Sequence, residues 1–182
     1  MNDESEQSRT ARLRANCARC CGLCCVAGSF NADQGFGFDK PAHTACRHLQ
    51  ADDRCAIHDA LRVRGFPACA AFDCYGAGQW VTQQLFAGKS WRSSPQIARR
   101  MFTVYAAYRP LHELMALLDL AITQVPPAEA IALERCLLEI ESICRAGTDL
   151  PTTTQLNTLR QQVRRLLRER LGSMRRSPPE SW

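Results

Sequence analysis

The sequence predicts a mainly α protein with two unlike parts, a loop-rich cysteine-cluster module followed by a small helical bundle. The first reason is cysteine usage, because nine of the eleven cysteines lie between Cys17 and Cys74. The second is that apolar residues recur every three or four positions from about Gln79 onward, the period of an amphipathic helix. A chain of 182 residues can bury an ordinary core, so a missing core does not explain the cysteines.

Composition divides the chain further. Residues 1–16 are polar and charged, and we expect them to be disordered. Residues 17–78 combine Gly, Pro and Asp with short apolar pieces, which predicts loops, turns and short helices that need cross-links to hold their shape. Residues 79–171 form the predicted bundle, and residues 172–182 read as a disordered tail.

The first long helix is predicted to begin near Ser94–Pro95 and to carry one apolar stripe. Pro110 falls inside it, so a kink or break is expected there. The stripe comprises Met101, Tyr105, Tyr108, Leu111, Met115, Leu118 and Ile122.

Two further helices follow. The string "VPPAEA" suits a helix start, because proline is favoured in the first turn, and Gly147 suits the end of the same helix. A third helix is expected after Pro151. Cys136 and Cys144 fall on the apolar face of the second helix, where buried thiols behave as small hydrophobic groups rather than ligands. The inward faces contain Leu133, Cys136, Leu137, Ile140, Ile143 and Cys144, then Leu156, Leu159, Val163, Leu166 and Leu167.

Charge and hydropathy restrict the setting of the chain. No amino-terminal signal pattern and no apolar stretch of membrane-spanning length is present, which predicts a cytoplasmic protein with reduced thiols. The net charge of +5 comes almost wholly from arginine, since Lys40 and Lys89 are the only lysines. Arg164, Arg165 and Arg168 could face nucleic acid, but the solvated face of a bundle helix is the favoured interpretation.

The spacing of the cysteines points to metal ligation. Two-residue spacing, as between Cys17 and Cys20, lets two thiolates from one turn reach the same ion, and distant pairs close the site. An all-cysteine shell also suits an iron–sulfur cluster. An odd number of cysteines fits a complete disulfide framework poorly, and adjacent cysteines are poor partners for each other. The sequence shows no Ser-His-Asp, HExxH or paired-carboxylate arrangement.

The string "CCGLCC", from Cys20 to Cys25, matches a CxxxCC signature and resembles the YkgJ-type cysteine-cluster family, described as a putative zinc- or iron-chelating domain. The later string "CRHLQADDRCAIHDALRVRGFPACAAFDC" is similar to the second half of that family. His58 stands where the family often has an aromatic residue, and "RGFPAC" is a looser form of its Arg-Pro element. The resemblance covers roughly residues 17–78.

This resemblance implies a set of metal ligands. Cys20, Cys24 and Cys25 match the signature, and Cys21 falls in its variable slot, where we expect a replaceable residue. His58, His43 and His48 are more readily interpreted as ordinary histidines than as ligands. With Cys17 retained, the predicted ligand set is Cys17, Cys20, Cys24, Cys25, Cys46, Cys55, Cys69 and Cys74.

The metal and the function stay open at this point. A [4Fe–4S] cluster is slightly favoured over Zn²⁺ because the module offers more cysteines than one zinc ion needs, with Cu(I) as a third option. The favoured function is a non-catalytic metal-binding or interaction module whose helical half contacts a protein partner. One alternative is an iron–sulfur redox or protein-methylation-related enzyme or accessory, admitted by the resemblance alone. Another is a metal-responsive nucleic-acid-binding regulator.

Overall fold

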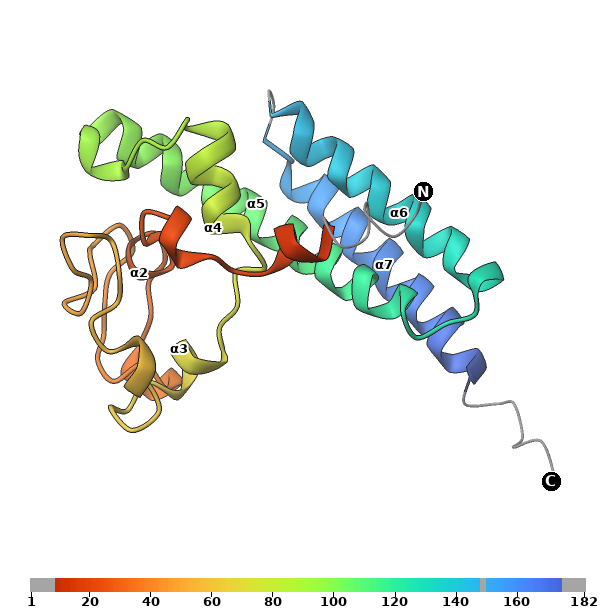
Figure 1. The fold of residues 1–182 in the computed structure, drawn as a ribbon, viewed down its shortest axis with the longest axis horizontal. Helices are drawn as coiled ribbons and strands as arrows, with labels where there is room; N and C mark the ends of the chain where they lie inside the picture. Colours follow the sequence, from red (N-terminus) through yellow and green to blue (C-terminus); the bar gives the residue numbers. More distant parts are fainter. Residues whose placement is uncertain (1–8, 148–149, 175–182) are drawn as a thin grey trace. The chain divides into compact units, whose positions relative to one another are not determined.

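The computed structural model describes residues 9–147 and 150–174, and within them it is helical and irregular, with no strand element (Figure 1). The predicted mainly α class is confirmed. The chain divides into two compact units, one formed by Ala11–Arg109 and one by Met1–Thr10 together with Pro110–Trp182. No helix in the described ranges is long and apolar enough to cross a membrane.

The unit Ala11–Arg109 is built from short helices separated by loops, as its Gly and Pro content predicts. Its last element, α5, is long and continues into the other unit. The helices of this unit are η1 (Cys17–Arg19), α2 (Leu23–Val26), η2 (Ala32–Gln34), η3 (His58–Ala60), α3 (Pro67–Ala71), α4 (Ala77–Trp80), the π-helix η4 (Val81–Leu85), η5 (Trp91–Ser93) and the start of α5 (Pro95–Ile122).

Gly22, inside "CCGLCC", fixes the position of α2. It has a φ of 69°, in the left-handed region that favours glycine, and it precedes the first residue of the helix. A Cβ atom at this position would lie 2.7 Å from Leu49 Cδ1 and 2.9 Å from the carbonyl oxygen of Asp53. The glycine therefore lets α2, with Cys24 and Cys25, lie directly against the loop that precedes Cys55.

Aromatic side chains form a small core for the loops between α2 and α3. Phe38 makes edge-on contacts with Phe30 at 5.4 Å and with Phe66 at 5.7 Å, measured between ring centroids. Phe36 stacks on Phe30 at 4.8 Å. Isolated antiparallel bridges between Phe30 and Lys40 and between Leu49 and Cys55 close two of these loops.

Lys40 provides a further cross-link in the same loops. Its side chain is buried, with an exposed fraction of 4% for the residue, and its ammonium group donates to main-chain carbonyl oxygens. A buried cation is tolerated only when its hydrogen bonds are made. The acceptors are the carbonyls of Gly28 (2.5 Å), Thr44 (2.9 Å), Pro41 (3.0 Å) and Val26 (3.5 Å).

The boundary between the units differs from the predicted one. The sequence places it between residues 78 and 79, whereas the structure places it between Arg109 and Pro110. The cysteine loops have few apolar and polar partners of their own. Such partners come from α4, η4, η5 and the first part of α5, so these helices pack with the loops.

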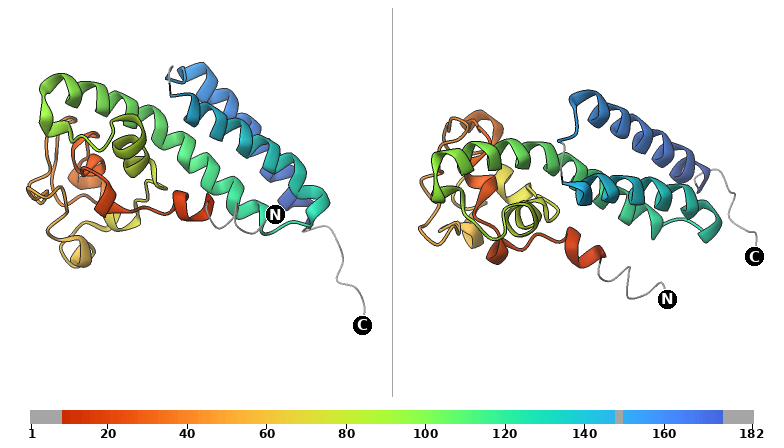
Figure 2. Two further views of the ribbon diagram at one scale, coloured as in Figure 1. Left: turned by 45° about the horizontal axis from the view of Figure 1, so that its top comes forward. Right: turned by 90° about the horizontal axis from the view of Figure 1, so that it is seen from above.

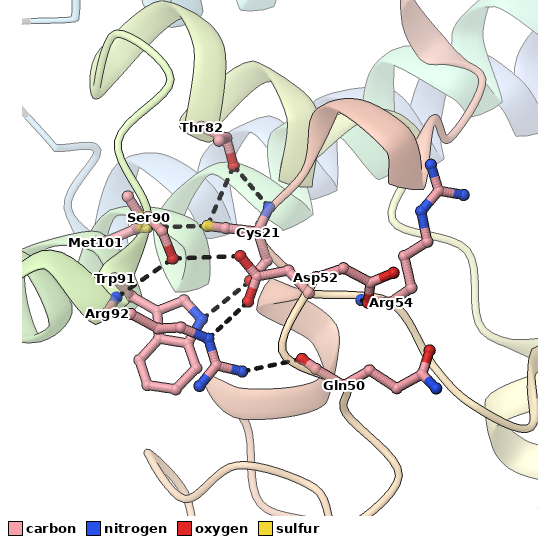
Figure 3. A network of polar contacts seen from close by, with 10 residues as sticks. Cys21, Gln50, Asp52, Arg54, Thr82, Ser90, Trp91, Arg92 and Met101 are labelled. Carbon is pink, nitrogen blue, oxygen red and sulfur yellow. Dashed lines mark hydrogen bonds and ion pairs between the residues drawn. The ribbon is translucent and has the colours of Figure 1, made fainter.

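Cys21 shows this packing directly (Figure 3). Its sulfur lies 3.4 Å from Thr82 Oγ1 and 3.4 Å from Met101 Sδ, and its carbonyl oxygen accepts a hydrogen bond from Trp91 Nε1 at 2.9 Å. Nearby, Arg92 Nε donates to Asp53 Oδ1 at 2.9 Å. Residues on both sides of the predicted boundary thus share one core.

Pro110 does not break α5. The helix continues through it to Ile122, so the predicted break is absent, although the division between the two units falls at this residue. Proline removes one main-chain hydrogen bond and crowds the preceding turn. Buried apolar side chains on either side, among them Tyr108 and Leu111, favour a continuous helix despite that loss.

The second unit contains the later part of α5 with α6 (Pro127–Ala146) and α7 (Thr153–Met174), and Figure 2 shows α6 and α7 running alongside each other. The predicted boundaries hold, since Pro127 opens α6 and Gly147, with a φ of 61°, ends it. Cys136 and Cys144 are buried, as predicted, as are Leu159 and Val163 of α7.

The predicted amino-terminal disorder is wrong for part of its range. Residues 9–13 are helical, because polar side chains there find partners. Arg9 Nε forms an ion pair with Asp119 Oδ1 at 2.6 Å, and Thr10 Oγ1 donates to the same carboxylate at 3.2 Å. Residues 1–8 and 175–182 lie outside the described residues, and α7 extends to Met174, three residues into the predicted tail.

Candidate metal centre

All eight predicted ligands belong to the unit Ala11–Arg109, and each is a free thiol. The eight cysteines lie in short helices, in the turns next to these helices, or in loops, so each sulfur lies close to a defined stretch of main chain. Cys17 lies in η1, Cys20 before α2, Cys24 and Cys25 in α2, Cys46 and Cys55 in loops, Cys69 in α3, and Cys74 before α4.

Cys24 interacts with several other predicted ligands. Its sulfur is 3.9 Å from the sulfur of Cys25, and this contact is the largest cause that raises the pKa of Cys24 well above its ordinary value. For five other cysteines, burial is the largest cause of a raised pKa, and the charge of Cys24 raises it further. These are Cys17, Cys20, Cys55, Cys69 and Cys74.

Cys46 joins the same group from another loop. Burial is the largest cause of the raised pKa of Cys55 and of Cys69, and the charge of Cys46 raises both values further. Its main-chain amide donates to the carbonyl oxygen of Cys25 at 2.9 Å, which ties its loop to α2. Every predicted ligand therefore interacts with at least one other predicted ligand.

Main-chain amides are directed at four of these sulfurs, each from the residue two positions further along the chain. His48 N donates to the sulfur of Cys46 at 3.4 Å. For Cys20, Cys55 and Cys74 such donors favour the thiolate, so they oppose the effect of burial on the thiol pKa. The other three pairs are Gly22 with Cys20, Ile57 with Cys55, and Gly76 with Cys74, and Leu23 and Gly78 add second amides to Cys20 and Cys74.

Gly78 brings two distant cysteines to one place on α4. A Cβ atom on this glycine would lie 2.7 Å from the sulfur of Cys20 and 3.8 Å from the sulfur of Cys74. Both sulfurs therefore occupy the space next to the Gly78 Cα atom. The absence of a side chain at Gly78 makes room for Cys20.

Tyr105, on α5, contributes a polar group that the sequence did not single out. The residue is buried, with an exposed fraction of 5%, and its hydroxyl has no hydrogen-bond partner within the described parts of the chain. Burial raises its pKa well above the ordinary value, and the charges of Cys24, Cys74 and Cys20 raise it further. The sequence places Tyr105 in the apolar stripe of the helix because of its helical spacing. Only its hydroxyl group distinguishes it from an ordinary core residue.

Cys21 occupies different surroundings from the eight. It is buried against Thr82 and Met101, and burial is the largest cause of its raised pKa. Thr82 Oγ1 in turn donates to the carbonyl oxygen of Gly78 at 2.8 Å. The structure thus gives Cys21 a packing role, and its predicted replaceability stays a prediction.

The histidines of this region are engaged away from the sulfurs. His43 stacks on Phe102 at 5.1 Å between ring centroids, and His48 makes an edge-on contact with Phe66 at 5.3 Å. The side chain of His58 is 67% exposed and lies next to Asp59. The donor set of the candidate centre is therefore composed of cysteine sulfurs.

The sulfurs are gathered but not closed around a single point. Across residues 9–147 and 150–174, no group of three or more His, Cys, Asp or Glu side chains is arranged to hold a metal ion directly. Burial, and after it the charges of neighbouring cysteines, disfavours the thiolates of Cys20 and Cys69 and raises their pKa values to about 12 and about 11. Ligation would require proton release and a contraction of the loops.

The arginines considered as a nucleic-acid surface belong to α7, in the other unit. Arg164, Arg165 and Arg168 line a shallow surface hollow together with Gln161 and Glu169. A carboxylate within the hollow weakens its attraction for phosphate.

Comparisons with known proteins give one relative and no assigned activity. No family model matches the chain. It is 39% identical over 153 residues, 83% of its length, to a protein of Bacillus subtilis (strain 168) described as "Uncharacterized protein YybG". The chain spans about half of that relative, 54% of its length. No solved structure matches.

Proposed function

We propose that the unit Ala11–Arg109 is a non-catalytic metal-binding module. Its cysteines would bind a [4Fe–4S] cluster, for which all-cysteine ligation is usual, with zinc as the alternative metal. The observation that carries the proposal is that main-chain amides are directed at Cys20, Cys46, Cys55 and Cys74, from four separate segments. Neutral thiols gain little from such donors, whereas thiolates are stabilised by them.

The donor set fits this proposal chemically. Histidine rings near the cysteines are packed against aromatic residues or exposed, which leaves sulfur as the ligand. The short helices of the unit are joined by loops, with no strand element among the described residues, and a group bound by several of these loops would cross-link the unit. Bound iron–sulfur would supply one-electron chemistry or such a cross-link, and bound zinc would supply the cross-link.

The test is elemental analysis and an optical spectrum of the full chain purified without oxygen. We expect iron and acid-labile sulfide with visible absorption, or zinc without colour, and either result supports a metal-binding module. A protein that contains neither metal, and takes up neither on reconstitution, would contradict the proposal.

Single substitutions sharpen the test. Cys24→Ser and Cys25→Ser should each lower the metal content and the melting temperature, because both sulfurs belong to the gathered set. Cys21→Ala is the matched control in the same string, and it should keep the full metal content. Unchanged metal content and melting temperature in both Cys24→Ser and Cys25→Ser would remove these residues from the ligand set.

A further inference from the structure

Tyr105 carries a buried hydroxyl that has no hydrogen-bond partner among the residues that the structure describes. The exposed fraction of the residue is 5%, and no donor or acceptor in the described ranges pairs with its hydroxyl. A buried hydroxyl without a partner is unfavourable, and native structures contain few of them. Such a group therefore calls for a functional explanation.

Three cysteines lie near enough to Tyr105 for their charges to act on its hydroxyl. The charges of Cys24, Cys74 and Cys20 all act on Tyr105, in that order of strength. Independently, the sulfurs of Cys20 and Cys74 share the space next to the Gly78 Cα atom. These residues all belong to the unit Ala11–Arg109, so one end of the sulfur cluster contains Cys20, Cys24, Cys74 and the Tyr105 hydroxyl.

We propose that the Tyr105 hydroxyl donates a hydrogen bond to the sulfur of a metal-bound cysteine at this end of the cluster, and so strengthens metal binding. This inference rests on the proposed function. A protonated thiol is a weak acceptor, whereas a metal-bound thiolate is a strong one, so ligation would create the acceptor that the hydroxyl lacks. Tyr105 is a positioning residue that acts through the ligands, because it need not contact the metal itself.

The test compares Tyr105→Phe with the wild type as full chains prepared without oxygen. Removing a hydrogen bond to a ligand typically weakens metal binding by about 10–100-fold. We therefore expect Tyr105→Phe to bind the same number of metal ions, with an affinity lower by that factor in competition with a chelator. The sulfur-to-metal charge-transfer band, measured with Co²⁺ as probe or on the native iron protein, should shift.

Stability separates this role from a purely structural one. Without metal, Tyr105→Phe should melt at the same temperature as the wild type or higher, because an unpaired hydroxyl has been removed. With metal, it should melt lower than the wild type. A structural role would lower both temperatures. Tyr108→Phe, three residues along the same helix and equally buried, measures the effect of losing another phenol hydroxyl and should not change the charge-transfer band.

The two proposals fail differently. If the wild type takes up no metal, both are overturned. If it binds metal and Tyr105→Phe binds it equally tightly with an unchanged band, only the role of Tyr105 is overturned. If Tyr105→Phe does not fold, the wild type still tests the role of Tyr105. Metal loading should then shift the infrared band of a buried tyrosine hydroxyl. The absence of a shift would contradict the inference.

Discussion

Lys40 illustrates how one residue can organise a loop region. Its ammonium group donates to carbonyl oxygens of residues on both sides of it, including Val26 at the end of α2 and Thr44, two residues before Cys46. Burial is the largest influence on the pKa of Lys40 and lowers it. The charges of the nearby Cys46 and Cys25 raise the same pKa. One positive charge thus joins two segments that contain predicted ligands, Cys25 and Cys46.

Replacing this lysine should destabilise the protein. Lys40→Met leaves several buried carbonyl oxygens without their donor, and we expect a loss of about 2–3 kcal/mol in the free energy of unfolding, measured by urea denaturation. Lys89→Met, at the other lysine, which is exposed, is the matched control and should be neutral. Equal stability of the two variants would show that the Lys40 contacts contribute nothing.

At the scale of elements, α4 lies close to the cysteines because Gly78 has no side chain. Gly78→Ala should favour the helix by up to about 1 kcal/mol through propensity alone. Its Cβ atom, however, would lie 2.7 Å from the sulfur of Cys20, which must move. We therefore expect weaker metal binding without a large loss of helix content, measured by chelator competition and circular dichroism.

Gly28→Ala is the control for that substitution. A Cβ atom there would meet nothing within 4 Å, and the main chain that accepts from Lys40 is unchanged. Its metal affinity should equal that of the wild type. If Gly78→Ala also binds metal as the wild type does, Cys20 is not held as a ligand at this place.

The helices were predictable because their starts and ends depend on local chemistry. Pro95 and Pro127 open α5 and α6, and Gly147 ends α6, as the sequence indicates. The unit boundary was not predictable, because it depends on contacts such as those of Cys21 with Thr82 and Met101, which join distant positions. The helical period also concealed Tyr105, since a core tyrosine and one that serves a site have the same spacing.

For the whole molecule, metal should reverse the response of stability to pH. In the metal-free protein, burial raises the pKa of Cys20 to about 12 and of Cys69 to about 11. These thiols hold their protons more tightly folded than unfolded, so their contribution is present below about pH 9 and is lost as pH rises through the folded values. Metal binding needs thiolates, so the loaded protein should instead lose stability as acid displaces the metal.

Melting temperatures between about pH 5 and pH 10, with and without metal, check this prediction. Burial also raises the pKa of Cys144 to about 12, in the other unit, and Cys144→Ala removes that alkaline contribution from the comparison. Identical pH profiles for metal-free and loaded protein would mean that the gathered thiols are not ligands.

The Lys40 ammonium stands where other proteins place a bound ion. Carbonyl oxygens that converge on one cation are a familiar way to bind potassium or calcium, and here the cation is covalently part of the chain and cannot diffuse away. The contacts that join Val26, Gly28, Pro41 and Thr44 therefore need no ion supply. Lys40 cross-links these loops as a bound ion would, whether or not a metal is present.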